Sequence, residues 1–463
     1  MKWRRPIQIA APLASVATLM LGLRVGGGDA IRAAVVYGAN PAQPPPGAKH
    51  RLAWQVLTFL EDRGVRETIA VKDLDVVARA NGEEAKWSGS TNEDGVAEAS
   101  LEFEKLPDFV DLEVRAARDP EPLAAGQAKV VEPMPEEADT AARMLRPTKR
   151  DGAIGLDVVI ETGRLITGFS TPIWVKVTPP PGTSTDSLDF ELEPEPGLAI
   201  DQPPGKPCGP DGWTEIDATA FGHVVGISIT AKSKTSDAKG TWFGVLPVAA
   251  GAFQPNLKRD EPAGQAFSAV LVAPNPRKVV YAEVDDVVGR AYAAALDVTV
   301  EAGDPTPRAR FEIPPLVEGI HWLVVSGEPR GAEKLDGATI AKPFYVGGPA
   351  RAACSIGPFL AEHQARPFRR RLAVDGFPLR NTRNRGKHRL GMLIALVSLL
   401  AAATLEILLL SASAREARIE LQLAELEDNQ KVTAKSPGGG LAIGLLVAVL
   451  GFALLAALLV MKS

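Results

Sequence analysis

The sequence predicts a mainly β protein in which tandem β-sandwich domains precede a C-terminal transmembrane helical hairpin. Turn signals recur roughly every 8 to 12 residues across three blocks, a spacing typical of β-sandwiches. Proline (38 residues) and glycine (43 residues) are frequent, as turn-rich chains require. Two long apolar runs follow near the C-terminus and have the length of membrane-spanning helices.

The composition limits the kinds of partner. The chain has 463 residues, enough for about two to four domains. Its net charge is −5, so it lacks the global basic field that captures nucleic acid. We therefore expect no nucleic-acid partner.

Residues 1–30 are predicted to be a signal peptide or a signal anchor. Lys2, Arg4 and Arg5 precede an apolar run, and small residues, Gly28 and Ala30, then stand at both positions that a signal peptidase reads. Cleavage after Ala30 and an uncleaved anchor both remain open. Either one predicts export of the body that follows.

Composition shifts divide the rest of the chain into domains. The boundaries follow clusters of proline and glycine and the strand-like runs between them. We predict a proline-rich spacer at residues 31–48, a linker at 132–153, and β-sandwich domains at 49–131, 154–253 and 265–348.

Within the first block, residues 51–60 and 74–80 have the apolar and β-branched character of strands. Asn81-Gly82 follows the second strand and is the strongest short signal for a β-hairpin. Residues 96–103 alternate with a period of two, as a half-buried strand does.

A polar turn, residues 91–97 (TNEDGVA), introduces that alternating strand. With it, residues 49–131 resemble bacterial immunoglobulin-like (Ig-like) or macroglobulin-type β-sandwich modules, and residues 154–346 resemble them in architecture. The resemblance implies an Ig-like fold. The macroglobulin thioester motif follows neither Cys208 nor Cys354, so the resemblance does not imply protease trapping.

We find no motif that carries catalysis. None of the five histidines stands in metal-ligand spacing, and no nucleophile elbow or phosphate-binding loop occurs. We expect a non-enzymatic protein without catalytic, cofactor-binding or metal-binding residues. The cluster Asn92-Glu93-Asp94 has two readings, a calcium site or a turn. Trp213 also has two readings, a carbohydrate platform or a core residue.

The two cysteines, Cys208 and Cys354, leave two alternatives open. An even count in a cysteine-poor exported chain fits a single disulfide, whereas two buried unpaired thiols fit equally well.

The C-terminal region carries the membrane prediction. We expect transmembrane helices at 391–410 and 441–460 and a helical segment at 414–428 between them. Glu406 is the only charge in either span, which makes it a candidate intramembrane functional acid or a residue that reaches the interface.

A basic segment at residues 366–389 precedes the first span. It holds nine basic residues and one acid, which the positive-inside rule would place in the cytoplasm, whereas the N-terminal signal predicts export. We expect the export signal to dominate and the basic side chains to contact anionic lipid head groups. The predicted membrane-surface residues are Arg369, Arg370, Arg371, Arg380, Arg383, Arg385, Lys387 and Arg389.

Together these features predict a multi-pass protein of a bacterial inner membrane with a periplasmic body. Its expected partners are the lipid bilayer and a protein of the envelope or membrane, or a glycan. Two alternatives stay open: a transmembrane sensor that relays ligand binding through the hairpin helix, and an envelope enzyme with an unrecognised site.

Overall fold

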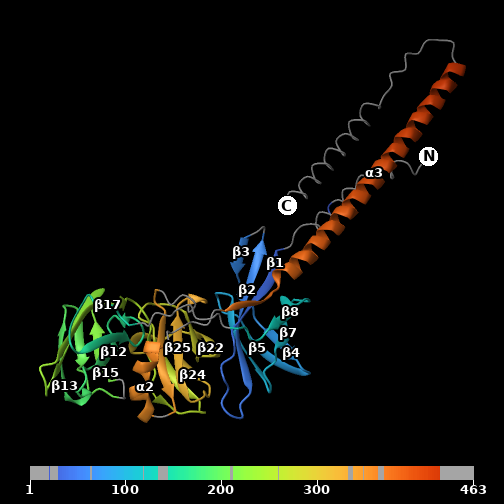
Figure 1. The fold of residues 1–463 in the computed structure, drawn as a ribbon. Helices are drawn as coiled ribbons and strands as arrows, with labels where there is room; N and C mark the ends of the chain where they lie inside the picture. The colour runs from blue at the N-terminus through green and yellow to red at the C-terminus, as the bar shows by residue number, and fades with distance from the viewer. Residues whose placement is uncertain are drawn as a thin grey trace. The chain divides into compact units, whose positions relative to one another are not determined.

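The computed structural model describes residues 20, 30–62, 65–117, 119–133, 144–208, 212–258, 260–331, 337–347, 349–362 and 370–427. Two compact units occur. The body comprises residues 34–59 and 68–376, and the described part of the second unit comprises the remaining residues, including the long helix α3 (Phe377–Glu427). The fold class is mainly β, and the body contains three two-sheet modules (Figure 1).

Module 1 is built from two antiparallel sheets that enclose an apolar core around Trp54. One sheet has the order β27-β1-β2-β3 with β6 paired to β2, and the other has the order β5-β4-β7-β8. Its strands are β1 (Ile31–Gly38), β2 (His50–Asp62), β3 (Val65–Thr68), β4 (Leu74–Ala80), β5 (Glu83–Gly89), β6 (Val96–Phe103), β7 (Phe109–Ala116), β8 (Ala124–Lys129) and β27 (Arg371–Asp375).

The predicted hairpin at Asn81-Gly82 is confirmed. Both residues have positive φ angles, 54° and 80°, as a two-residue primed turn requires. The register then pairs Ala80 with Glu83 across the turn.

Module 1 extends beyond its predicted boundaries at both ends. Residues 31–38, predicted as part of a spacer, form β1, and residues 371–375, predicted as part of a basic membrane-proximal segment, form β27. The two strands pair antiparallel, with Val36 opposite Val374. The chain thus leaves module 1, builds modules 2 and 3, and returns to complete module 1. Because the partner of β27 lies more than 300 residues away, the sequence around residues 371–375 gives no local sign that they form a strand.

Module 2 consists of the sheets β10-β12-β15-β14 and β11-β17-β16-β13, with β9 paired to β17. Leu188, Phe190 and Leu192 face or border its core, whereas the alternating acids of β13 face solvent. Its strands are β9 (Lys149–Gly152), β10 (Gly155–Ile160), β11 (Leu165–Ile166), β12 (Ser170–Thr178), β13 (Leu188–Pro194), β14 (Leu198–Gln202), β15 (Trp213–Ala220), β16 (Val224–Ser233) and β17 (Lys239–Ala249), with the 3-10 turn η1 (Thr185–Ser187).

Module 3 consists of the sheets β18-β20-β24-β23 and β19-β26-β25-β21-β22. It begins at residue 254, earlier than the predicted 265, because β18 pairs with β20. Its strands are β18 (Gln254–Asn256), β19 (Asp260–Glu261), β20 (Phe267–Val272), β21 (Val279–Asp285), β22 (Arg290–Asp297), β23 (Thr299–Glu301), β24 (Asp304–Ile313), β25 (Gly319–Ser326) and β26 (Ile340–Val346).

Helix α2 (Pro349–Glu362) joins modules 2 and 3, and the sequence did not predict it. Its Ile356 and Leu360 pack in one buried cluster with Trp174 and Trp213 of module 2 and Trp322 of module 3. A Cβ on Gly357 would lie 2.9 Å from the Trp213 ring, so a glycine lets the helix approach this closely. Trp213 is therefore a core residue, and its reading as a carbohydrate platform is wrong.

Helix α3 runs without interruption through three segments that were predicted separately: the end of the basic segment, the first apolar run and the helical segment of the loop. Within the residues that the structure describes, no helix meets the length and apolarity required to span a membrane. The predicted second span at 441–460 and nearly all of the predicted signal segment lie outside the described residues.

Candidate functional site: a buried charge cluster between modules 1 and 3

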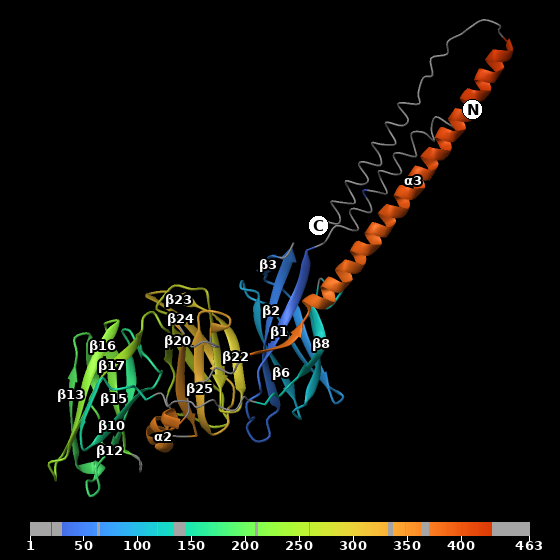
Figure 2. The same cartoon turned by 45° about the horizontal axis from the view of Figure 1, so that its top comes forward.

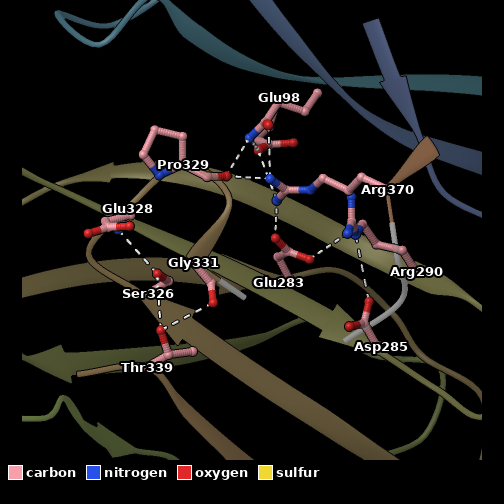
Figure 3. Close-up of polar contacts among 11 residues, drawn as sticks. Glu98, Glu283, Asp285, Arg290, Ser326, Glu328, Pro329, Gly331, Thr339 and Arg370 are labelled. Carbon is pink, nitrogen blue, oxygen red and sulfur yellow. Dashed lines mark hydrogen bonds and ion pairs between the residues drawn. The ribbon is translucent and has the colours of Figure 1, made fainter. Parts of the chain in front are cut away.

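Five charged side chains lie together between modules 1 and 3, and each is at most 4% exposed. We call them the charge cluster (Figure 3). Module 1 contributes one acid from β6, module 3 contributes two acids from β21 and an arginine from β22, and the residue directly before β27 contributes the second arginine. The members are Glu98, Glu283, Asp285, Arg290 and Arg370.

The hairpin of β21 and β22 positions the module 3 members. Glu283 and Asp285 are two residues apart on β21 and so point to the same face. Asp286 closes the turn, because its Oδ1 accepts hydrogen bonds from the backbone N–H groups of Val288 (2.6 Å) and Gly289 (2.7 Å).

A segment of module 1 lies against this turn. The backbone of Arg290 donates to Asn40 O (2.8 Å) and accepts from Ala42 N–H (3.0 Å). A Cβ on Gly289 would lie 2.3 Å from Asn40 O, so only glycine leaves room for this approach. Residues 40–42, predicted as a free spacer, are therefore a contact between the two modules.

Arg370 reaches across the interface and contacts both modules. Its guanidinium donates to Gln55 Oε1 (2.8 Å), to the backbone carbonyl of Pro329 and to Glu283, and it lies 3.6 Å from Glu98 Oε1. Gln55 also donates to Glu98 (2.6 Å) and to Pro329 O (2.9 Å). Charged hydrogen bonds of this kind are about twice as strong as neutral ones.

Glu283 lies between the two arginines. Its Oε2 is 2.5 Å from Arg290 Nη2, while its Oε1 contacts Arg370 (Figure 3). Asp285 is held less closely, since its Oδ1 lies 3.7 Å from Arg290 Nε. Glu283 is thus the best-compensated acid of the cluster.

The cluster has three carboxyl groups and two guanidinium groups, so full ionisation would leave one uncompensated negative charge in a buried place. Burial raises the pKa of Glu98 and raises the pKa of Asp285 well above its usual range, although the two arginines oppose both shifts. These two groups are therefore where the cluster binds protons.

The loop that carries Pro329 is itself fixed by hydrogen bonds (Figure 3). Ser326 Oγ accepts from Glu328 N–H (3.1 Å), and Thr339 Oγ1 donates to Ser326 Oγ (3.3 Å) and to Gly331 O (3.4 Å). The loop whose carbonyl receives Arg370 is thus held by hydrogen bonds within module 3.

The turn of residues 91–97 forms a second contact between the same modules. Asn92 Oδ1 accepts from the N–H groups of Asp94 (3.0 Å) and Val96 (2.9 Å), and its amide donates to Tyr281 Oη (2.8 Å). Tyr281 donates in turn to Asp94 (2.7 Å), and burial raises the pKa of its phenol. Asn92 Oδ1 is thus taken up by two backbone N–H groups of its own turn, and these hydrogen bonds favour the reading as a turn.

Of the predicted membrane-surface residues, Arg370 and Arg371 lie elsewhere than expected. Arg370 is enclosed in the charge cluster, and half-buried Arg371 donates to Asn40 Oδ1 (2.9 Å) and to the carbonyl groups of Lys129 and Val130. Arg369 lies outside the described residues. The other five lie in the first turns of α3: Arg380, Arg383, Arg385, Lys387 and Arg389.

The remaining predicted residues are placed as follows. Glu406 lies in α3. Cys208 is disulfide-bonded, and Cys354, the only other cysteine of the chain, lies in α2.

Of the members of the charge cluster, only Arg370 was singled out from the sequence. The one sequence signal for the others is weak: Glu283 and Asp285 lie on one face of an otherwise apolar strand, VVYAEVD. Acids in this pattern also occur on the solvent-exposed face of a sheet, so the pattern does not indicate a buried charge. What the cluster can do is hold two modules together through charge pairing, since its side chains are closed to solvent.

Comparisons with known proteins find only solved structures of low identity and low TM-score. No family model and no curated protein matches the chain. Among solved structures, the Escherichia coli adhesin FdeC is 13% identical and covers 69% of this chain and 98% of its own, with a TM-score of 0.16. An I-band fragment of titin is 7% identical, covering 68% and 98%, with a TM-score of 0.15. The alpha-2-macroglobulin of E. coli is 11% identical, covering 70% and 23%, with a TM-score of 0.17.

Proposed function

We propose that this chain is a non-enzymatic protein of a bacterial inner membrane that displays its three β-modules in the periplasm to bind a protein partner. The observation that carries the proposal is the joining of the modules. Modules 2 and 3 share a buried tryptophan cluster with α2, and modules 1 and 3 share the charge cluster. Modules joined by buried contacts offer a partner a preorganised surface, which lowers the entropy cost of binding.

Membrane anchoring is supported by the sequence of α3 and by its exposed side chains. Residues 391–410 hold a single charge, Glu406. Large apolar side chains of this helix are each more than half exposed, an arrangement that favours lipid over water. They include Leu390, Leu393, Leu396, Val397, Leu400 and Ile407.

The exposed side chains of Arg385 and Arg389 support the proposed contact with the membrane surface. They stand four residues apart on α3, directly before the apolar run, and share one helix face. Basic side chains at this position would attract anionic head groups, each by about 1 kcal/mol.

A protein partner is favoured over a glycan because five of the six tryptophans in the body are buried, and the sixth, Trp87, is partly buried. Five body tryptophans are at most 4% exposed: Trp54, Trp174, Trp213, Trp242 and Trp322. Sugar rings stack on exposed aromatic faces, so these residues are not available for that role.

A transmembrane sensor is the second candidate. It is favoured by the chain path, because β27 ends at Asp375 and α3 begins at Phe377, only two residues later. A change within the body would thus have a short covalent route to the helix.

The experiment that tests the proposal has two parts. Alkaline carbonate extraction of bacterial membranes should leave the full chain in the pellet and release a chain that comprises only residues 31–376. In-membrane crosslinking followed by affinity purification should then recover one protein partner with the full chain. Release of the full chain by carbonate would refute the anchor, and exclusive recovery of glycan would refute the partner class.

A further inference from the structure

We infer that residues 370–376, the strap, couple the docking of module 3 on module 1 to the attachment of the strand that leads into α3. The inference rests on the second candidate function, the transmembrane sensor, and deepens it by naming how a binding event in the body would reach the C-terminal helix. Three features of the strap carry it: its first residue, its second residue and its strand.

The first residue of the strap binds module 3. Arg370 contacts Glu283 of β21 and the carbonyl of Pro329 in the loop after β25, and both groups belong to module 3. Its side chain is completely buried. If module 3 moves away, the guanidinium loses these partners, and only Gln55 and Glu98 of module 1 remain near it.

The second residue of the strap binds the segment that also contacts module 3. Arg371 donates to Asn40 Oδ1, and the backbone carbonyl of the same asparagine accepts from Arg290. Asn40 also exchanges two hydrogen bonds with Glu132, which hold it at the edge of module 1. Arg371 and Arg290 are therefore linked through a single residue.

The strand of the strap has one pairing edge within the described sheet. β27 is the edge strand of the order β27-β1-β2-β3, and it pairs only with β1 over four residue pairs. Val374 anchors it in the module 1 core, and Gly376 donates to Ala34 O (2.9 Å). A Cβ on Gly376 would lie 1.9 Å from Leu123 O, so only glycine lets the C-terminal end of the strap pack this closely against module 1.

Short edge strands open locally at low free-energy cost. The opening of β27 is opposed directly by the contacts of Arg370 with Glu283 and Pro329 of module 3. It is opposed indirectly by the hydrogen bond of Arg371 to Asn40, a module 1 residue whose backbone carbonyl accepts from Arg290 of module 3. Separation of module 3 should therefore loosen β27. By thermodynamic reciprocity, loosening β27 should weaken the docking of module 3 by the same factor.

The test is hydrogen–deuterium exchange on the full chain in detergent micelles, with far-UV circular dichroism as the check of folding. Glu283→Gln removes the charge by which module 3 binds Arg370 of the strap and keeps the volume of the side chain. We expect the amides of residues 372–375 to exchange at least tenfold faster in this variant. The control is Glu301→Gln in the same module, which removes an exposed pair with Arg310 and should leave those amides unchanged.

The reciprocal variant is Gly376→Ala, with Val374→Ala as a milder substitute if the first does not fold. Neither touches module 3, yet each should accelerate exchange of residues 283–290. Unchanged exchange at 372–375 in Glu283→Gln, or at 283–290 in both strap variants, would overturn the inference. Carbonate extraction tests membrane anchoring without depending on this coupling, so failure of the coupling and failure of the proposed function are distinguishable.

Discussion

Replacing Arg370 with methionine tests the charge cluster most severely. The variant removes a completely buried guanidinium and leaves three carboxyl groups with one arginine. Breaking a buried ion pair by removing one partner costs about 3–5 kcal/mol. Because Glu283 keeps Arg290 at 2.5 Å, we expect the lower end, about 3 kcal/mol of the free energy of unfolding.

The assay is urea unfolding of the full chain, monitored by far-UV circular dichroism. Arg310→Met is the matched control, because Arg310 pairs with Glu301 on the exposed surface of module 3. A double-mutant cycle with Glu283→Gln should give a cost well below the sum of the two single variants. The reasoning would be refuted if Arg370→Met destabilised the chain no more than Arg310→Met does.

Two further predictions concern protons and the disulfide. Because burial raises the pKa values of Glu98 and Asp285 in the docked state, docking takes up protons. The stability that these protonated groups contribute to docking should be fully present below their ordinary pKa of about 4. It should be lost as the pH rises through the raised pKa values. The melting temperature should therefore fall as the pH rises above about 4, and Asp285→Asn should flatten that fall; an equally steep profile in the variant would contradict the assignment. Cys208→Ser should cost about 2–4 kcal/mol of the free energy of unfolding, and the unreduced wild-type chain should take up no thiol-alkylating reagent when unfolded. Labelling of two thiols in that unreduced chain would contradict the bridge.

Much of the β architecture could be predicted from the sequence, because its signals are local. Period-two alternation located β6, and the Asn81-Gly82 turn fixed the hairpin of β4 and β5. Turn residues recur wherever a strand must reverse, so they separated the three modules as well. The resemblance to Ig-like modules rested on the same local features.

The charge cluster could not be predicted, because its members are brought together only by the path of the whole chain. Glu98 and Glu283 are 185 residues apart, and Arg370 follows after the rest of module 3. In isolation each resembles an exposed charge on a strand or in a basic run.

The strap and α2 were missed for related reasons. β27 has five residues, and its partner β1 stands at the other end of the body. Helix α2 contains Pro358 and Gly357, which are typical of loops, and its helical form is stabilised by tertiary packing against the tryptophan cluster.

We propose that the β-module body is held on the outer side of an inner membrane, and protease accessibility is the most direct test of that location. Intact spheroplasts that express the full chain are treated with protease, and the body is detected with an antibody against module 2. We expect complete digestion of the body while a cytoplasmic marker survives. Protection of the body in intact spheroplasts, with digestion only after lysis, would contradict it.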